Sequence, residues 1–353
     1  MHQPPKSKSG QLIELLRARI LAGEWAARMP AERQLAEEYF VSRTTLRAAL
    51  QALTHDGLLK NPPHTRGGRS LERAAATVQA RPRRGEAVIL TPSLRESPVL
   101  WEHLAILRER LGAAGILLHV REAARLTEET HPGNSLRRWA DATPETVWIL
   151  HKMPVKVQHA AQQLGLKAIV FGTAFPEIEL PQIDVDFRAV ARHATGRCLA
   201  RGHRKLAVLV HRTSLAGDAE VIEGVREELA RYDAPPPLVL KHDFNRARLI
   251  DTLDQRLVPA AGRPEVLLVV NQHHLLTTLP HLLRRGLRIP EDLSLIYLSN
   301  DPAVERLSPL PERYDLGERL LGRLAAAAQS RLAGEIPASS RLLPRLLKGE
   351  TLG

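Results

Sequence analysis

Short aliphatic runs alternate with helical patterns from about residue 87 to residue 297, and this alternation limits the folds open to the chain. Each run is followed by a stretch in which apolar residues recur every three or four positions. Parallel strands need such crossovers, so the pattern predicts parallel sheets covered by helices, an α/β architecture. We expect strands at 87–90, 147–150, 168–171, 206–210, 266–270 and 293–297, and helices at 101–111, 157–164, 190–199, 221–229 and 275–283.

The loops that follow these strands are the expected ligand site. Ligands on open α/β sheets bind outside the carboxyl ends of the strands, where neighbouring loops meet. The segments that would line such a pocket are 91–95, 151–153, 211–218 and 271–274.

The front of the chain has a different pattern, made of short helices. Apolar residues between Leu12 and Leu21 share one helical face, and Glu32 to Phe40 gives a second short helix. Ser42 is placed to cap a third helix that runs to about His55. Segments 58–59 and 69–71 read as two short strands joined by a turn. This order predicts a small α+β winged helix-turn-helix whose third helix presents Arg43, Thr44 and Arg47 to a DNA major groove.

The basic charge supports a polyanion partner for this front segment. The chain has a net charge of +11, and residues 1–85 contain fifteen lysines and arginines against seven acidic residues, a net of +8. Neutralisation of phosphates by such side chains dominates non-specific affinity for nucleic acids.

Three sequence blocks at the front resemble the GntR family of winged-helix regulators. They are PAERQLA from Pro30, VSRTTLRAAL from Val41, and GLL from Gly57. The resemblance implies DNA contacts by Arg33, Ser42, Arg43, Thr44, Thr45 and Arg47, and by His64, Thr65, Arg66 and Gly67 of the wing. Two features depart from the family: Phe40 replaces a usual turn glycine, and Asn61-Pro62-Pro63 interrupts the first wing strand.

The rest of the chain resembles the sensor domain of LacI/GalR repressors, which is of the periplasmic-binding-protein type. The resemblance is carried by LARGHRKLAVL from Leu199, RGLRIPEDLSLI from Arg285 and DLG from Asp315. It implies two lobes, with chain crossings near 184–188, 299–301 and 334–339. The whole is similar to hybrid repressors such as the arabinose-responsive ones. We expect a DNA-binding domain at 1–71, a basic linker at 72–85 and a sensing and dimerisation domain at 86–353.

Two anchors that the sensor family uses for sugars are replaced in this chain. Val221 stands where an arginine is usual, and Gln272 where an aspartate is usual. Hydrogen bonds to charged groups contribute about 1.5–3 kcal/mol each, so we expect no tight binding of a simple pentose or hexose. The polar residues left as candidate effector contacts are Ser93, His151, Asp243, Asn271 and Gln272.

These observations predict a cytoplasmic transcription regulator, a repressor in the first instance, that binds a pseudo-palindromic operator as a homodimer. We expect no membrane segment, because the longest aliphatic runs are too short to span a bilayer, and no metal site, because no cysteine or acidic cluster stands at ligand spacing beside the histidines. We expect no cofactor and no enzymatic activity, because neither a phosphate-binding glycine loop nor a nucleophile elbow is present. The lone Cys198 is expected to be a buried hydrophobe. Two alternatives stay open: a regulator with an aminotransferase-like sensor, and a ligand-independent architectural DNA-binding dimer. Activation in place of repression is open too.

Overall fold

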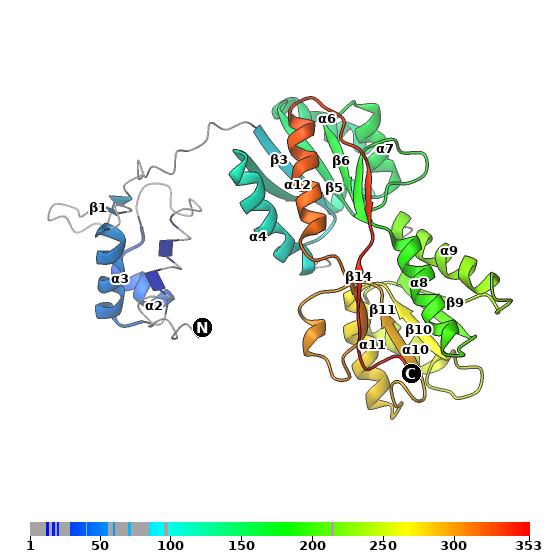
Figure 1. Ribbon diagram of the computed structural model, residues 1–353. Helices are drawn as coiled ribbons and strands as arrows, with labels where there is room; N and C mark the ends of the chain where they lie inside the picture. Colours follow the sequence, from blue (N-terminus) through cyan, green and yellow to red (C-terminus); the bar gives the residue numbers. More distant parts are fainter. Residues whose placement is uncertain are drawn as a thin grey trace. The chain divides into compact units, whose positions relative to one another are not determined.

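The chain divides into two compact units, Met1–Pro82 and Arg83–Gly353 (Figure 1). The computed structural model describes residues 12–13, 16–17, 20, 29–39, 41–55, 59–60, 70–71, 85–94, 98–212 and 215–353.

The first unit contains the helix pair that the sequence predicts. Helix α2 (Glu32–Glu38) and helix α3 (Arg43–His55) pack around a core that includes Leu35, Leu46 and Leu50. The Ser42 hydroxyl accepts a hydrogen bond from the Thr45 backbone N–H at 3.1 Å, so the predicted N-cap is confirmed. Residues 12, 13, 16, 17 and 20 are helical as expected, and Leu12 and Leu16 are buried.

Two short antiparallel strands follow the helices, within one residue of their expected positions. Strand β1 (Leu59–Lys60) pairs with β2 (Ser70–Leu71). The departures noted at Phe40 and at 61–63 lie outside the described residues.

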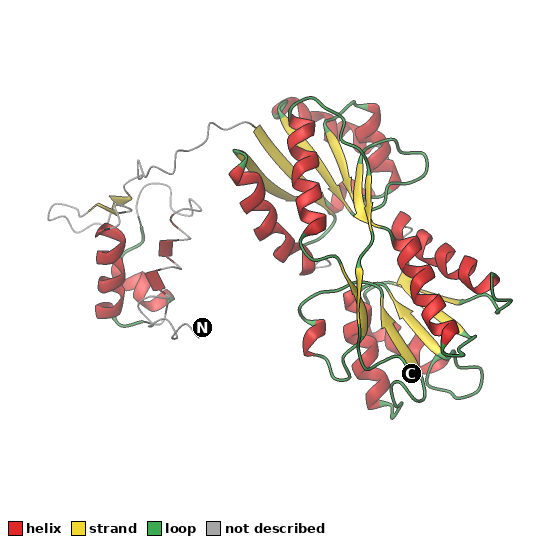
Figure 2. Ribbon diagram, in the orientation of Figure 1, coloured by secondary structure: helices red, strands yellow, loops and turns green. Residues whose placement is uncertain are grey.

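The second unit has two lobes, each a twisted sheet with helices on both faces (Figures 1 and 2). The sheet of the first lobe has the order β13-β7-β6-β5-β3-β4, and all its neighbours are parallel. Its strands are β3 (Gly85–Thr91), β4 (Ile116–Glu122), β5 (Thr146–His151), β6 (Ala168–Phe171), β7 (Gln182–Val185) and β13 (Ser340–Leu342).

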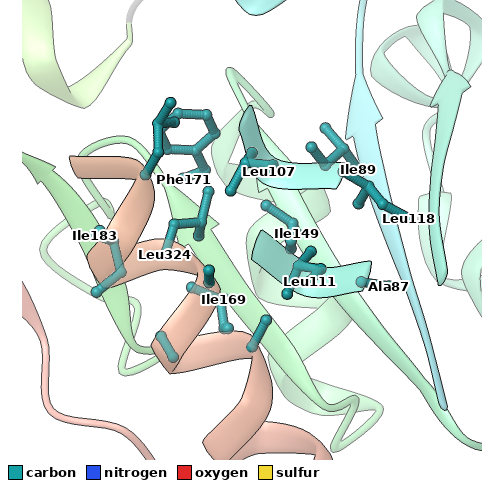
Figure 3. Close-up of a cluster of buried hydrophobic side chains, with 14 of the residues drawn as sticks. Ala87, Ile89, Leu107, Leu111, Leu118, Ile149, Ile169, Phe171, Ile183 and Leu324 are labelled. Carbon is teal, nitrogen blue, oxygen red and sulfur yellow. The ribbon is translucent and has the colours of Figure 1, made fainter. Parts of the chain in front are cut away.

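Both faces of this first sheet are buried, as the continuous aliphatic runs predict. Helices α4 (Pro98–Ala113) and α12 (Arg319–Leu332) cover one face, where Ile89, Ile149 and Leu324 meet (Figure 3). Helices α5 (Ala124–Glu128), α6 (Pro132–Ala142) and α7 (Val155–Gln163) cover the other. Helix α12 comes from the far end of the chain, so the first lobe is completed only when the C-terminal segment folds back onto it.

The second lobe repeats this design. Its sheet has the order β14-β12-β11-β10-β8-β9, parallel except where β12 meets β14. The strands are β8 (Leu206–His211), β9 (Leu238–His242), β10 (Val266–Val269), β11 (Ser294–Tyr297), β12 (Glu312–Asp315) and β14 (Arg345–Leu347). Helices α8 (Phe187–Ala200) and α9 (Ala216–Ala230) cover one face, and α10 (Arg246–Arg256) and α11 (Gln272–Arg284) the other. Cys198 is buried in the α8 core as predicted, and burial raises the pKa of its thiol to about 12.

The chain passes between the lobes three times, and two of these crossings differ from the expectation. The first lies at Asp186, between β7 and α8. The second lies at 316–318, after β12, and not at 299–301, because β12 pairs in parallel with β11 and so keeps that segment in the second lobe. The third lies at 343–344 and not at 334–339, because β13 still belongs to the first sheet.

The close packing of α8 on α9 depends on Gly224. A Cβ at this position would lie 2.5 Å from the Arg188 carbonyl oxygen and 3.0 Å from the Ala191 Cβ. We therefore expect Gly224→Ala to lower the free energy of unfolding by about 1–3 kcal/mol in spite of the better helix propensity of alanine.

Gly112 on α4 is the matched control for this substitution. It is an exposed helical glycine, and a Cβ there meets no atom within 4 Å. Gly112→Ala should raise the free energy of unfolding by up to about 1 kcal/mol. Chemical denaturation of both variants measures the effect, and equal effects of the same sign would contradict the packing argument.

Candidate ligand cleft and nucleic-acid interface

A cavity of about 230 Å³ lies between the two lobes and is lined from both of them. The first lobe contributes residues at the carboxyl ends of β5, β6 and β7, and the second contributes the segment 215–218 before and within α9, the start of α11 and the end of β11. This is the position at which open α/β sheets bind ligands. Three of the four loops expected from sequence line this cavity; the described part of segment 91–95 does not.

The wall from the first lobe is aromatic and carries one ion of each sign. Phe171 packs against His151, with ring centroids 5.3 Å apart. Asp184 at the end of β7 accepts a hydrogen bond from the Thr173 hydroxyl at 2.5 Å, and burial raises the pKa of its carboxyl to about 6. Lys152 has a left-handed backbone, with φ of 52°. A non-glycine residue in this conformation costs about 1 kcal/mol, and such strain concentrates at functional sites.

The histidines of this wall are neutral at physiological pH. Burial lowers the pKa of His103 to about 4 and holds the pKa of His151 well below its usual value, with the charge of Lys152 adding to the effect on His151. The Thr91 hydroxyl lies 3.1 Å from His151 Nδ1. These rings are therefore uncharged hydrogen-bonding and stacking groups in the cleft.

The wall from the second lobe holds several buried polar atoms that have no hydrogen-bond partner among the described residues. They are Asp218 Oδ2 on α9, Asn271 Nδ2 and Gln272 Oε1 at the start of α11. Buried polar groups are almost always satisfied in folded proteins, by protein or by bound molecules. Their position on the cavity wall indicates that they bind a ligand or ordered water.

Asp218 is 8% exposed, and burial raises the pKa of its carboxyl to about 7, although the positive charges of Lys152 and Lys241 and a backbone hydrogen bond with His211 act in the opposite direction. In the folded state this group holds its proton to a higher pH than in the unfolded chain. Its contribution to stability is therefore present at low pH and is lost as the pH rises from about 4 through about 7.

Asp218→Asn should abolish this loss of stability with rising pH, because asparagine does not titrate. As the pH rises from 5 to 7 we expect the variant to gain stability relative to the wild type, by at most about 1.4 kcal/mol per pH unit, because the folded carboxyl is still protonated there and the unfolded one is ionised. Urea unfolding at several pH values measures the difference, with Asp251→Asn on the exposed face of α10 as the control. Parallel pH profiles for wild type and Asp218→Asn would contradict the raised pKa.

The structure brings together three of the five candidate effector residues. His151, Asn271 and Gln272 line the cavity. Ser93 and Asp243 are not among the described residues that line it. Asp243 follows the edge strand β9 and pairs with Arg248, whose Nη2 lies 2.9 Å from its Oδ2. Val221, in the position of the missing arginine, is fully buried in the α8/α9 core and does not face the cavity.

Sequence reasoning missed the charged residues of the cleft. Asp184, Asp218 and Lys152 all line it, whereas the one carboxylate predicted from the sequence, Asp243, does not. Asp218 and Lys152 fall within two of the expected pocket loops, so their location was available from the pattern. Nothing in the pattern, however, separates an inward carboxylate from the many solvated ones.

The exposed face of the first unit carries the residues expected to contact DNA. Arg33, Ser42, Arg43, Thr44 and Arg47 are exposed, and Thr45 is half-buried with its hydroxyl 2.8 Å from that of Ser42. Arg47 Nε lies 2.9 Å from Glu32 Oε2, which ties the start of α3 to α2. The wing residues His64, Thr65, Arg66 and Gly67 lie outside the described residues.

In the described part of the chain, every helix is too short or too polar to span a membrane. Among the same residues, no three histidine, cysteine or acidic side chains are grouped so that they could hold a metal ion.

The two units match two different family models. Residues 8–64 match the bacterial regulatory proteins of the gntR family, and residues 195–352 match the periplasmic binding protein-like domain. The second unit is thus a two-lobed domain of the periplasmic-binding-protein type. The chain as a whole joins a gntR-type helix-turn-helix to this domain, as the sequence blocks suggested. An aminotransferase-like sensor, the first alternative, is wrong.

Curated relatives are regulators by name. Catabolite control protein A of Staphylococcus epidermidis is 21% identical over 169 residues, which cover 46% of this chain and 50% of that protein. The HTH-type transcriptional regulator CelR of Thermobifida fusca is 25% identical over 171 residues, 48% of this chain and 50% of its own length. The chain therefore spans about half the length of the curated relatives it matches.

Solved structures of similar fold cover most of the chain. The transcription regulator CcpA of Lactococcus lactis has a TM-score of 0.65 at 13% identity, over 76% of this chain and 99% of that one. A LacI family regulator from Mycobacterium smegmatis has a TM-score of 0.63 at 18% identity, over 75% and 98%. At these identities the likeness shows the fold alone.

Proposed function

We propose that the chain is a DNA-binding transcription regulator whose operator affinity changes when a small molecule binds between the lobes of its second unit. The observation that carries this proposal is the presence in one chain of a capped, cation-bearing helix α3 and of a cleft with buried unpartnered polar atoms. The gntR-type match and the names of the relatives support it.

The proposed DNA contacts begin at the N-terminal end of α3. Arg43 and Thr44 are exposed in its first turn, where a recognition helix meets base edges in the major groove. Arg47 lies one turn further, and its ion pair with Glu32 would have to open before its guanidinium could reach a base. We assign base reading to Arg43 first, with phosphate or base contacts from Arg33, Ser42, Thr45 and Arg47.

The lobes supply a means of response. In the described part of the second unit three chain segments join them, so they can hinge about the cleft, and a ligand that contacts both walls favours the closed arrangement. The ligand shifts DNA affinity only to the extent that open and closed forms bind DNA differently. We propose that the chain acts by this binding equilibrium, without catalysis, in the cytoplasm.

We also propose a homodimer on a pseudo-palindromic operator. A single helix of 13 residues reads few base pairs, and two-fold dimers double the site while matching its symmetry. Protection footprints should show two symmetric half-sites whose centres lie about one helical turn, or a multiple of it, apart. Full protection of one isolated half-site by a monomer would contradict this arrangement.

The proposal is tested by selecting genomic fragments of the source organism on the full chain and repeating the selection with candidate metabolites. We expect a small set of fragments that share a symmetric motif, and at least one metabolite that changes their recovery. Enrichment of fragments that share no motif would overturn the proposal that the chain is a sequence-specific regulator. A shared motif whose recovery no metabolite alters would favour the architectural dimer.

A further inference from the structure

The strongest unexplained feature of the cleft is the carboxylate of Asp218. It lies in the first turn of α9, it is more than nine-tenths buried, and its Oδ2 has no hydrogen-bond donor among the described residues. Lys152, from the other lobe, acts on it through space but makes no hydrogen bond with Oδ2. A buried carboxylate oxygen of this kind needs a donor from outside the chain.

A second acceptor lies in the same cavity. Gln272 Oε1, at the start of α11, is buried and has no hydrogen-bond partner among the described residues. Cleft atoms that lack a partner therefore include two acceptors, Asp218 Oδ2 and Gln272 Oε1, and one donor, Asn271 Nδ2.

The charges of the cleft favour a cation. Two carboxylates, Asp184 and Asp218, line the cavity together with one ammonium, that of Lys152, while His103 and His151 are held neutral by burial. Arg341, which pairs with Glu220, and Lys241 act on the two carboxylates from outside the lining. Asp184 is already engaged by the Thr173 hydroxyl, which leaves Asp218 as the carboxylate open to a ligand. Opposite charge brought to a desolvated carboxylate is worth far more than the same contact in water.

The remaining wall is apolar. Phe171, Phe175, Phe187 and Tyr297 line the cavity, together with aliphatic side chains from both lobes. Such a surface stabilises a hydrocarbon or aromatic body and offers few partners to the several hydroxyls of a sugar.

We propose that the cleft binds a small protonated organic amine, with its ammonium hydrogen-bonded to Asp218 and Gln272 and an aromatic or aliphatic body against Phe171 and Phe187. This inference rests on the proposed function, in which the cleft is the ligand site, and it names the chemical class of that ligand.

Calorimetric titration of the full chain with 2-phenylethylamine, 2-phenylethanol and glucose tests the proposal. At pH 8 the amine is charged, and so is Asp218, whose carboxyl has a pKa of about 7. We expect the amine to bind at least about tenfold more tightly than the isosteric alcohol, and glucose to bind more weakly than either. At pH 7, amine binding should also release protons, so the measured heat should depend on the ionisation enthalpy of the buffer.

Asp218→Asn should weaken binding of the amine by about tenfold to a hundredfold and leave the alcohol nearly unchanged. It should also remove the buffer dependence. Asp251→Asn, which removes an exposed carboxylate on α10, is the control for lost charge. It should change the affinity for neither ligand. Gln272→Ala is a second variant in case Asp218→Asn does not fold. It should weaken binding of the amine more than binding of the alcohol, by a smaller factor than Asp218→Asn does.

Equal affinity for the amine and the alcohol overturns the proposal, as does unchanged amine binding by Asp218→Asn or no amine binding up to about 10 mM. These results are separable from failure of the proposed function. If metabolites other than amines release DNA, the proposed function as a regulator holds and the proposed ligand class is wrong. If the amine binds as described and DNA affinity does not change, the ligand class stands and the proposed regulation is wrong.

Discussion

Arg197→Ala is expected to lower the free energy of unfolding by about 3–5 kcal/mol. Arg197 on α8 makes a bidentate ion pair with Glu312 on β12, with Nε 2.7 Å from Oε1 and Nη2 3.0 Å from Oε2. The Glu312 side chain is 3% exposed, so removal of its partner leaves a desolvated charge within the second lobe. Breaking a buried pair from one side is costly for this reason, whatever the pair itself contributes.

A surface pair of the same geometry provides the control. Arg288 and Asp292 are also bidentate, at 2.9 and 2.7 Å, but the Arg288 side chain is 71% exposed. Arg288→Ala should lower the free energy of unfolding far less than Arg197→Ala does, because solvent screens an exposed pair. Replacement of both partners, Arg197→Met with Glu312→Leu, should recover most of the lost stability. Equal losses for Arg197→Ala and Arg288→Ala in denaturant titrations would contradict the burial argument.

Arg43→Ala is expected to weaken binding of the selected operator by about 1–3 kcal/mol, which corresponds to about fivefold to 150-fold in Kd. Arg43 is the first residue of α3 and is exposed. If Arg43 reads a base, its removal should also relax the base preference at one operator position. A phosphate contact would instead weaken all sequences alike and reduce the dependence on salt.

Fluorescence anisotropy with the operator and with single-base variants of it separates these outcomes. Arg226→Ala on the exposed side of α9 removes the same charge from the second unit and should leave operator affinity unchanged. Wild-type affinity and wild-type base preference in Arg43→Ala would show that α3 is not the recognition helix.

The sequence predicted the architecture well where the signal was local and repeated. Aliphatic runs such as 168–171 and 206–210 became central strands, and the Ser42 cap set the start of α3. The predicted positions of the lobe crossings were less accurate, because these positions depend on which strands pair. Nothing local in 299–301 indicates that β12 returns to the side of β11.

Strands with exposed residues were also missed. Strand β4 and strand β9 lie at sheet edges, where charged residues such as Arg121 and Lys241 interrupt the aliphatic pattern. In the cleft, the loops were predicted but the key side chains were not. The role of Asp218 depends on desolvation by residues from both lobes, which no window of sequence contains.

The most direct test of the account is the operator Kd of the full chain, measured without ligand and with saturating cleft ligand, for wild type and Asp218→Asn side by side. Coupling between two sites is reciprocal, so operator and ligand must change the affinity of one another by the same factor. We predict that the ligand changes the operator Kd of the wild type by at least about fivefold. At the same ligand concentration it should change the operator Kd of Asp218→Asn much less. An operator Kd that stays constant while the ligand saturates the cleft would contradict a ligand-responsive regulator.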